Sequence, residues 1–196
     1  MLNAREPLHP APRRILVAGT SGSGKTTLAG RIASTVGVPH TEIDALYHGP
    51  NWVPRESFIR DVAALAAEPT WVTEWQYGQA RPLLLQRADL LVWLDLARSV
   101  VMERVVRRTA QRRRTGTALW NGNREPALST FFTDRDHIVR WAWRTHHESA
   151  HRVAAAVTAR ADLTVVRLTR QREVDQWLEG PLRDCVRPGY DTGRTT

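Results

Sequence analysis

Cysteine, lysine and long hydrophobic runs are scarce in this 196-residue chain. Its one cysteine, Cys185, excludes an internal disulfide and is typical of a protein from a reducing compartment. No charged-then-apolar leader opens the sequence, and the longest strongly apolar run, at residues 90–94, is far too short to cross a bilayer. We therefore expect a cytoplasmic protein without a membrane partner, whose oligomeric state the composition leaves open.

The scarcity of lysine is informative because the chain is rich in arginine. Lysine and arginine together number 28 against 20 acidic residues, a formal net charge of +8, yet Lys25 is the only lysine. It lies in residues 19–26, Gly-Thr-Ser-Gly-Ser-Gly-Lys-Thr, which match the phosphate-loop pattern G-x-x-x-x-G-K-[ST]. A compact ammonium on a flexible stem bridges β- and γ-phosphate oxygens better than the wide guanidinium fork of arginine does. The sequence thus predicts nucleotide chemistry.

The flanks of this motif have the expected character. An apolar, partly β-branched run at 15–18 precedes it, and residues 26–33 carry apolar side chains at helical spacing, so the motif joins a strand to a helix. Its glycines permit the backbone angles that turn successive N–H groups toward one phosphate cluster, and the helix N-terminus adds positive potential. Thr26 would supply a hydroxyl to Mg²⁺. The expected nucleotide-binding residues of the loop are Gly19, Ser21, Gly22, Ser23, Gly24, Lys25, Thr26 and Thr27.

The rest of the chain alternates strand-like and helical patterns. Apolar runs that resemble strands occur at 15–19, 38–43, 71–73, 90–94 and 163–168. This alternation predicts one α/β domain, a parallel sheet with helices on both faces, with ligands at the carboxyl ends of the strands. We expect the domain to span residues 13–180, with flexible tails at 1–12 and 181–196.

Three acidic residues follow these strand-like runs. Asp44, Glu74 and Asp95 each stand where an apolar run gives way to a loop. A carboxylate at such a position can hold Mg²⁺ or accept the proton of an attacking hydroxyl. The alternative for each is a loop or capping carboxylate, and the turn-like residues after Asp95 favour that alternative there.

A dense arginine run follows the fourth strand-like segment. Its members are Arg104, Arg107, Arg108, Arg112, Arg113 and Arg114. At helical spacing, Arg104, Arg107 or Arg108, and Arg112 can share one face, where they would neutralise a transferring phosphoryl group. Facing outward, the same run would be a solvated stripe or a nucleic-acid patch. Residues 120–125, Trp-Asn-Gly-Asn-Arg-Glu, form a turn pattern flanked by polar hooks, which is typical of a lid.

A second motif competes with the phosphate loop. Residues 147–151, His-Glu-Ser-Ala-His, match H-E-x-x-H, the pattern of a zinc hydrolase. No histidine follows residue 151, so a third ligand would have to be an acidic residue such as Glu173. Arginines at 140 and 144 share the expected helix face, and positive charge disfavours a metal cation. A polar helix face is the favoured interpretation.

Two of the eight tryptophans stand near the expected ligand edge. Trp52 and Trp75 lie in or beside the loops after the second and third strand-like runs, where a planar acceptor could stack. Packing in the core is the alternative for both, and it is the favoured one.

Taken together, these segments resemble the adenylate-kinase-like P-loop family known as DNA topology modulation proteins, and more distantly the shikimate and nucleoside monophosphate kinases. The resemblance spans roughly residues 13–180. It is carried by residues 19–26, by 43–48 with Trp52, and by 71–74, 88–95, the arginine run, 120–125 and 140–144.

The resemblance implies a P-loop three-layer fold whose five-stranded parallel sheet has the order 2-3-1-4-5. It also implies a metal role for Glu74, which therefore ranks above Asp95, and an arginine-rich lid at about 104–125. Adenine would lie between a lid arginine and residues 169–171. The acceptor region would contain Asp44, Tyr47, His48, Trp52 and Arg55. One departure is that relatives read Asp-Gly-Asn-Tyr where this chain reads Glu-Trp-Gln-Tyr at 74–77, so Trp75 would narrow the acceptor side.

The leading hypothesis is an ATP-dependent phosphotransferase similar to nucleoside monophosphate kinases, acting on a small phosphate acceptor, with ATP and Mg²⁺. The expected catalytic residues are Lys25, Asp44, Arg104, Arg108 and Arg112, with Asp44 orienting or deprotonating the acceptor. Arg108, Thr169 and Arg170 would also contact the nucleotide. Two alternatives stay open: a protein that uses ATP to regulate nucleic-acid binding, and an ATPase without an acceptor.

Overall fold

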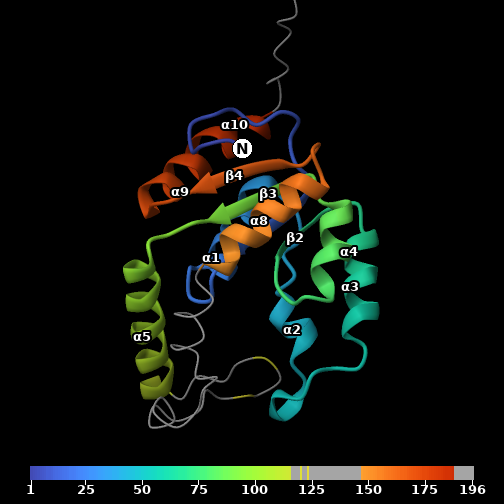
Figure 1. Cartoon of the computed structure of the whole chain (residues 1–196), viewed down its shortest axis with the longest axis vertical. Coiled ribbons are helices and arrows are strands. Elements are labelled where there is room, and N and C mark those ends of the chain that lie inside the picture. Colours follow the sequence, from blue (N-terminus) through green and yellow to red (C-terminus); the bar gives the residue numbers. More distant parts are fainter. Residues whose placement is uncertain (116–119, 121–122, 124–146, 188–196) are drawn as a thin grey trace, which may run out of the picture.

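The computed structural model describes residues 1–115, 120, 123 and 147–187, apart from the side chains of residues 112 and 113. Its centre is a parallel sheet of four strands in the order β2-β1-β3-β4. The strands are β1 (Arg14–Gly19), β2 (Trp71–Glu74), β3 (Leu90–Leu94) and β4 (Thr164–Leu168). Both β2 and β3 pair with β1, and β4 pairs with β3 (Figure 1). The two central strands, β1 and β3, are short apolar runs that are buried along almost their whole length, as expected for a parallel sheet.

The expectation of a fifth strand at 38–43 was wrong for the described chain, although the other four strands have the expected order. This segment makes one isolated parallel bridge, between His40 and Val72. Two residues explain why the pairing stops. Pro39 has no N–H to donate to a ladder, and the N–H of Ile43 donates to the Glu74 side chain instead of a strand. The chain then enters helix α2 (Ile43–Tyr47).

Helices cover both faces of the sheet, which gives three layers (Figure 1). One face carries α1 (Lys25–Val36), α5 (Arg98–Thr115), α9 (Gln171–Trp177), the π-helical segment η3 (Leu178–Leu182) and the short α10 (Arg183–Cys185). The other carries α2, α3 (Phe58–Ala67), α4 (Ala80–Arg87) and α8 (Glu148–Ala159), while a 3-10 turn, η1 (Pro50–Trp52), follows α2.

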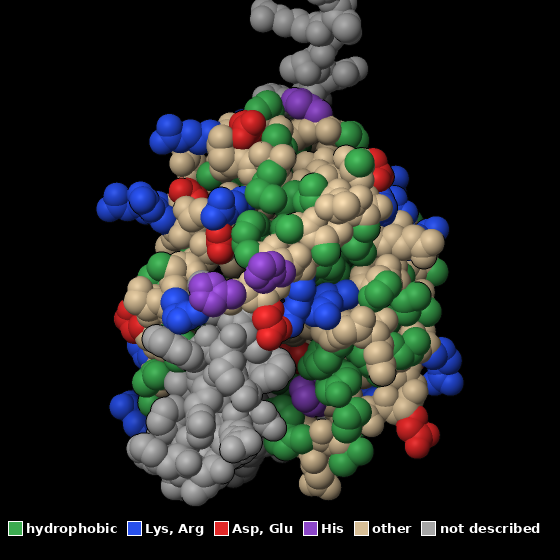
Figure 2. All heavy atoms as spheres, in the orientation of Figure 1, with side chains coloured by type: hydrophobic (Ala, Val, Ile, Leu, Met, Phe, Trp, Pro, Cys, Tyr) green, Lys and Arg blue, Asp and Glu red, His purple; other side chains and the backbone are tan. Residues whose placement is uncertain are grey.

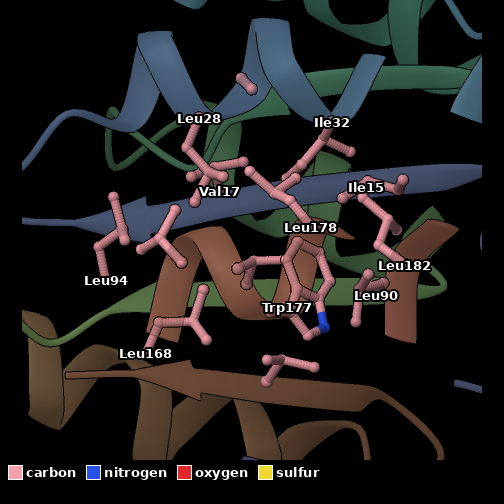
Figure 3. Close-up of a cluster of buried hydrophobic side chains, with 14 of the residues drawn as sticks. Ile15, Val17, Leu28, Ile32, Leu90, Leu94, Leu168, Trp177, Leu178 and Leu182 are labelled. Carbon is pink, nitrogen blue, oxygen red and sulfur yellow. The ribbon is translucent and has the colours of Figure 1, made fainter. Parts of the chain in front are cut away.

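Alternate residues of the strands divide the core into two clusters. Ile15 and Val17 point toward α1 and η3, where Trp177 fills the centre of the cluster that Figure 3 shows. Leu16 and Ala18 face the opposite layer. This alternation fixes the register of β1, so that its carboxyl end, Gly19, is held by two packed layers. Within the described residues, no helix has the length and hydropathy that a bilayer crossing needs.

The first residues, expected as a flexible tail, pack against the domain. The Leu2 N–H donates to the Val165 carbonyl at 2.7 Å, and the Leu2 carbonyl accepts from the Arg167 N–H at 2.9 Å. Ala4 and Leu8 are buried. The physical reason is that β4 is an edge strand with unpaired backbone groups, which Leu2 satisfies. At the other end, Leu182 is fully buried, so the packed domain extends past residue 180, while residues 188–196 lie outside the described chain.

Candidate active site

The phosphate-loop motif forms the connection between β1 and α1. Gly22 and Gly24 have φ angles of 83° and 98°, the left-handed region that glycine adopts without strain. A Cβ on Gly22 would lie 2.0 Å from Cγ2 of Val105 in α5, so that position has no room for a side chain. The loop is therefore closely covered by the first half of α5 and requires glycine for two separate reasons.

Lys25 is buried at the start of α1, with 7% of its surface exposed. Its Nζ donates to the carbonyl of Thr20 at 3.1 Å, and no ion pair of the described residues includes it. Burial lowers the pKa of Lys25 to about 8, although Asp44 and Glu74 act to raise it. The Ser23 hydroxyl beside it is buried without a hydrogen-bond partner in the described chain. A buried ammonium and an unsatisfied hydroxyl at a helix N-terminus suit an anion.

A cavity of about 770 Å³ opens from the loop along the carboxyl edge of the sheet. It joins the loop to residues of α2, α5 and α9 and to the loop after β2. Its lining consists of Ser21, Gly22, Ser23, Gly24, Lys25, Thr26, Thr27, Leu28, Arg31, Glu42, Asp44, Gln76, Leu94, Arg104, Arg108, Trp120, Gln171 and Val174. Ten residues of the sequence hypothesis therefore share one cavity: the seven at 21–27 together with Asp44, Arg104 and Arg108. Gly19 does not line the cavity but lies next to a residue that does, since a Cβ on Gly19 would be 2.7 Å from the Ser23 hydroxyl.

Asp44 lies in the first turn of α2, where two side chains from the loop after β2 hold it. Its Oδ1 accepts a hydrogen bond from the Tyr77 hydroxyl at 2.6 Å and from the Gln76 amide at 3.0 Å. Burial, and then the charge of Asp44, raise the pKa of Tyr77, so the phenol keeps its proton. His48 Nε2 lies 3.2 Å from the same hydroxyl, and burial lowers the pKa of His48. Asp44 is thus a carboxylate positioned by neutral donors.

Glu74, expected at the metal, is almost completely buried at the end of β2. Its Oε2 accepts the Ile43 N–H at 3.0 Å, and its Oε1 lies 3.2 Å from His40 Nε2. Burial alone would raise the pKa of Glu74, but the hydrogen bonds from His40 and Ile43 outweigh it, and the pKa is lowered. Glu74 does not appear in the cavity lining, so its observed contacts anchor the start of α2 below Asp44.

The arginine run is split between the cavity and solvent. Arg104 donates to the Ser23 carbonyl at 2.9 Å and to the Gln171 side chain at 2.8 Å, and Arg108, one turn later, also lines the cavity. Arg107 and Arg114 are exposed. The Arg112 side chain lies outside the described part of the chain. On the face that Figure 2 shows, basic side chains are interspersed with acidic and hydrophobic ones. The geometry thus ties two arginines of the run to the phosphate loop.

Several expected acceptor residues have other surroundings. Trp75 is 9% exposed and packs in the core, where its indole N–H donates to the Arg81 carbonyl at 3.2 Å. Arg55 pairs with Asp61 at 3.0 Å. Neither Trp75 nor Arg55 lines the cavity. Trp75 therefore does not narrow the acceptor side of the cavity as expected, because its side chain packs in the core.

Tyr47 and Trp52 lie in an aromatic cluster beside Asp44, outside the lining itself. Tyr47 stacks on Tyr77 with ring centroids 4.0 Å apart, and Trp52 meets the ring of His48 edge-on at 5.0 Å. Asn51, Trp52 and Tyr77 have positive φ angles, and all three belong to the loops around this cluster. Backbone strain of this kind is often concentrated at functional sites.

At the nucleotide end, Thr169 and Arg170 do not line this cavity. The Thr169 hydroxyl and N–H both bond to Glu173, within the first turn of α9, and Arg170 is exposed. Gln171, the third residue of the expected segment 169–171 and the first of α9, does contact Arg104 and line the cavity.

Sequence reasoning also missed the contacts of Trp120 and Asn123 with α2 and the turn after it. The Trp120 indole donates to Glu42 at 2.7 Å and stacks on His48 at 5.9 Å. Asn123 is 6% exposed and donates to the carbonyl of Gly49 at 2.9 Å. The sequence predicted a turn with polar side chains at 120–125, but it did not indicate which residues these side chains would contact. The other residues of 116–125 lie outside the described chain.

The competing H-E-x-x-H motif begins α8. His147 forms a hydrogen bond with the Arg98 guanidinium, and Glu148 forms an ion pair with Arg152. Glu173, the suggested third ligand, is bound to Thr169. Among the described residues, no group of three histidine, cysteine or acidic side chains is arranged to hold a metal ion. The contacts of this motif are those of a polar helix face.

A parallel sheet between two layers of helices, with a phosphate loop between β1 and α1, is the architecture of the phosphate-loop fold. The structure superposes on a gluconokinase from Sinorhizobium meliloti 1021 with a TM-score of 0.51 and 22% identity, covering 89% of this chain and 94% of that one. Two other similar structures are a shikimate kinase from Bacteroides thetaiotaomicron (TM-score 0.46, 16% identity, 86% and 96% coverage) and a sugar kinase from Janibacter sp. HTCC2649 (0.44, 20%, 89% and 90%). No protein-family model and no curated protein matches the chain. The likeness to the gluconokinase establishes the fold, and the resemblance to DNA topology modulation proteins stays a prediction.

Proposed function

We propose that this protein is an ATP-dependent phosphotransferase that acts on a hydroxyl group of a small molecule. The observation that carries the proposal is the placement of Lys25 and Asp44 in one cavity. A phosphate-binding lysine and a carboxylate beside it are the two groups that phosphoryl transfer to a hydroxyl requires. The similar fold of the gluconokinase from Sinorhizobium meliloti agrees with this class of reaction.

In this proposal the phosphates of ATP lie on the backbone N–H groups of the phosphate loop, with Lys25 against the β- and γ-phosphates. Burial of Lys25, which forms no ion pair within the described chain, strengthens its attraction to the nucleotide. Arg108 adds a second positive charge in the cavity, where it neutralises charge on the transferring group. The nucleoside extends toward Gln171 and Val174 at the other end of the lining.

Asp44 accepts the proton of the attacking hydroxyl. Its Oδ1 is fixed by Tyr77 and Gln76, so the carboxylate is held in place before the acceptor binds. The hydroxyl then attacks the γ-phosphorus, the bond from this phosphorus to the bridging oxygen of ADP breaks, and the proton passes to Asp44.

The cavity also suits Mg²⁺, because the Thr26 hydroxyl lines it at the phosphate loop and offers a hard oxygen ligand beside the phosphate oxygens of ATP. The ion would neutralise the developing charge on the phosphates. The metal role expected for Glu74 stays a prediction, since its known contacts hold His40 and Ile43.

The test is ADP formation from ATP and Mg²⁺ across a panel of hydroxyl compounds, with Lys25→Ala as the blank. We expect a Lys25-dependent increase with one class of acceptor, and Asp44→Asn should depress transfer at least a hundredfold while changing ATP affinity little. Undiminished turnover by Lys25→Ala would refute the proposal. Equal losses of transfer and ATP affinity in Asp44→Asn would remove its catalytic assignment.

A further inference from the structure

We infer that the acceptor is an uncharged polyhydroxy compound, such as a sugar, a polyol or a nucleoside, and not a phosphate monoester or a carboxylate. This inference rests on the proposed function and concerns the acceptor end of the same cavity. It depends on the charges of the side chains that line this end.

The described lining of the acceptor end is acidic and neutral. Glu42 and Asp44 contribute two carboxylates from the start of α2, Gln76 an amide and Trp120 an indole. The positive groups of the described lining lie elsewhere: Lys25 and Arg108 lie with the loop, and Arg104 is bonded to the Ser23 carbonyl. Arg31, on α1, also lines the cavity and forms an ion pair with Asp175 at 2.7 Å. ATP would engage the charges at the loop, so an acceptor anion would meet two carboxylates without a further cation from the described lining.

Arg55, the arginine that the resemblance placed in the acceptor region, is engaged elsewhere. Arg55 forms an ion pair with Asp61 at 3.0 Å and contacts the Ala45 carbonyl, and it does not line the cavity. Arg152 acts on Lys25 through its charge, but it pairs with Glu148, and neither residue belongs to the lining. The net charge of the described side chains that line the acceptor end is therefore negative.

The remaining groups suit a ring or chain that carries hydroxyls. Carboxylates and the carbonyl of an amide accept hydrogen bonds from hydroxyl groups. The Trp120 ring bonds to Glu42 and stacks on His48, so it presents an aromatic wall beside the carboxylates. An aromatic wall beside such acceptors combines apolar contact with oriented hydrogen bonds, which is the usual construction of a small-molecule site.

The experiment compares acceptors that differ by one anionic group: adenosine with AMP, D-ribose with ribose 5-phosphate, and sorbitol with gluconate. For each pair we would measure Lys25-dependent ADP formation with saturating ATP and Mg²⁺. We expect the neutral member of the productive pair to have a kcat/KM at least about tenfold higher, the effect of roughly one unscreened charge contact.

Charge variants test the cause. Glu42→Gln keeps an acceptor for the Trp120 indole and removes one negative charge, so the ratio of neutral to anionic kcat/KM should fall about five- to tenfold. Glu68→Gln, an exposed carboxylate at the end of α3, is the matched control and should leave the ratio unchanged.

The outcomes separate the two proposals. Faster Lys25-dependent transfer to the anionic member of a pair would overturn this inference and leave the phosphotransferase intact. A ratio that Glu42→Gln does not change would overturn its electrostatic basis. Absence of Lys25-dependent stimulation by every compound would overturn the proposed function, and this inference with it.

Discussion

The hydroxyl of Tyr77 donates a 2.6 Å hydrogen bond to Oδ1 of Asp44, across 33 positions of the sequence. Tyr77 reaches this position with a φ of 56°, a left-handed conformation that costs a bulky residue about 1 kcal/mol or more. A strained residue that fixes a cavity carboxylate indicates that the placement of Asp44 is maintained at an energetic cost. The loop after β2 therefore positions the group that we assign as the base.

Tyr77→Phe tests this relationship. The variant keeps the stack on Tyr47 and removes only the donor to Asp44. We expect kcat to fall roughly tenfold, because a hydrogen bond to a charged group contributes about 1.5 to 3 kcal/mol, part of which Gln76 retains. ATP affinity, measured by calorimetry, should change less than about twofold. A parallel loss of ATP affinity would show that Tyr77 supports the whole cavity and not Asp44 in particular.

The phosphate loop and the positions of four strands could be predicted because they depend on local patterns, whereas the order of these strands was predicted only from the family resemblance. The glycines, Lys25 and Thr26 form one contiguous string, and each buried strand is a short apolar run. The same locality brought Asp44 forward as a candidate, since it follows such a run directly. These features need no knowledge of distant contacts.

The remainder depends on contacts between distant residues. Residues 38–43 had the composition of a strand, but the Glu74 side chain binds the Ile43 N–H and the segment becomes the start of a helix. Trp75 could have faced the acceptor or the core, and only the packing of α3 and α4 decides between them. Gln76 and Tyr77 belong to the segment 74–77 that was compared with the relatives. Their hydrogen bonds to Asp44, however, depend on the positive φ angle of Tyr77, which no sequence pattern predicts.

Lys25 gives a prediction on stability without nucleotide. Its folded pKa of about 8 lies below 10.5, the ordinary pKa of a lysine, so between these values the unfolded chain binds more protons than the folded one. Wild-type stability should therefore rise with pH through this window, and the cost of burying the ammonium is fully present below pH 8. Lys25→Met should raise the free energy of unfolding at pH 7 by roughly 1 to 3 kcal/mol.

Urea denaturation of wild type and Lys25→Met at several pH values provides the measurement. The difference between the two proteins cancels the titration of other groups, and it should shrink as the pH increases from about 8 toward 10.5. A difference that is constant across this range would mean that the ammonium is not destabilised by burial.

The same lysine predicts proton uptake when ATP binds. Phosphate oxygens beside Lys25 favour its charged form, so nucleotide binding should raise its pKa from about 8 and take up a proton near that pH. The affinity for a non-hydrolysable ATP analogue should decline as the pH rises above this value. Calorimetry at pH 8.5 in two buffers of different ionisation enthalpy should detect this proton uptake. The variant Lys25→Met is the control, because any uptake that it still shows comes from other groups.

The contact between Gly22 and Val105 predicts a coupling between the phosphate loop and α5. Gly22→Ala places a Cβ 2.0 Å from Cγ2 of Val105 at a φ of 83°, so we expect a loss of roughly 2 kcal/mol or more in stability. Gly37→Ala is the matched control, because Gly37 has a φ of 70° and nothing within 4 Å of its Cβ position. It should show the cost of the backbone angle alone.

A double-mutant cycle separates the clash from the strain. In the Val105→Ala background, Gly22→Ala should cost about 1 kcal/mol less than in wild type, because the atom that it meets is gone. Equal costs in both backgrounds would contradict the close packing of α5 on the loop. Thermal and urea denaturation without nucleotide provide both comparisons.

Asn123 predicts a separation between acceptor and nucleotide binding. Its Oδ1 accepts the Trp52 N–H at 3.0 Å, and its Nδ2 donates to the carbonyls of Gly49 and Trp120 at 2.9 Å each. Asn123→Asp keeps the acceptor for Trp52, removes both donors and sets a buried carboxylate against two carbonyl oxygens. Because these contacts hold the turn after α2 and none of them involves the phosphate loop, the KM of the acceptor should rise about tenfold, with the Kd of ATP nearly unchanged.

Trp120→Phe, which keeps an aromatic ring beside His48 and removes the donor to Glu42, should shift the acceptor KM in the same direction by a smaller factor. If either substitution weakened ATP binding as much as acceptor binding, the two ends of the cavity would have to be one cooperative unit, and the assignment of residues 42–52 to the acceptor alone would fail.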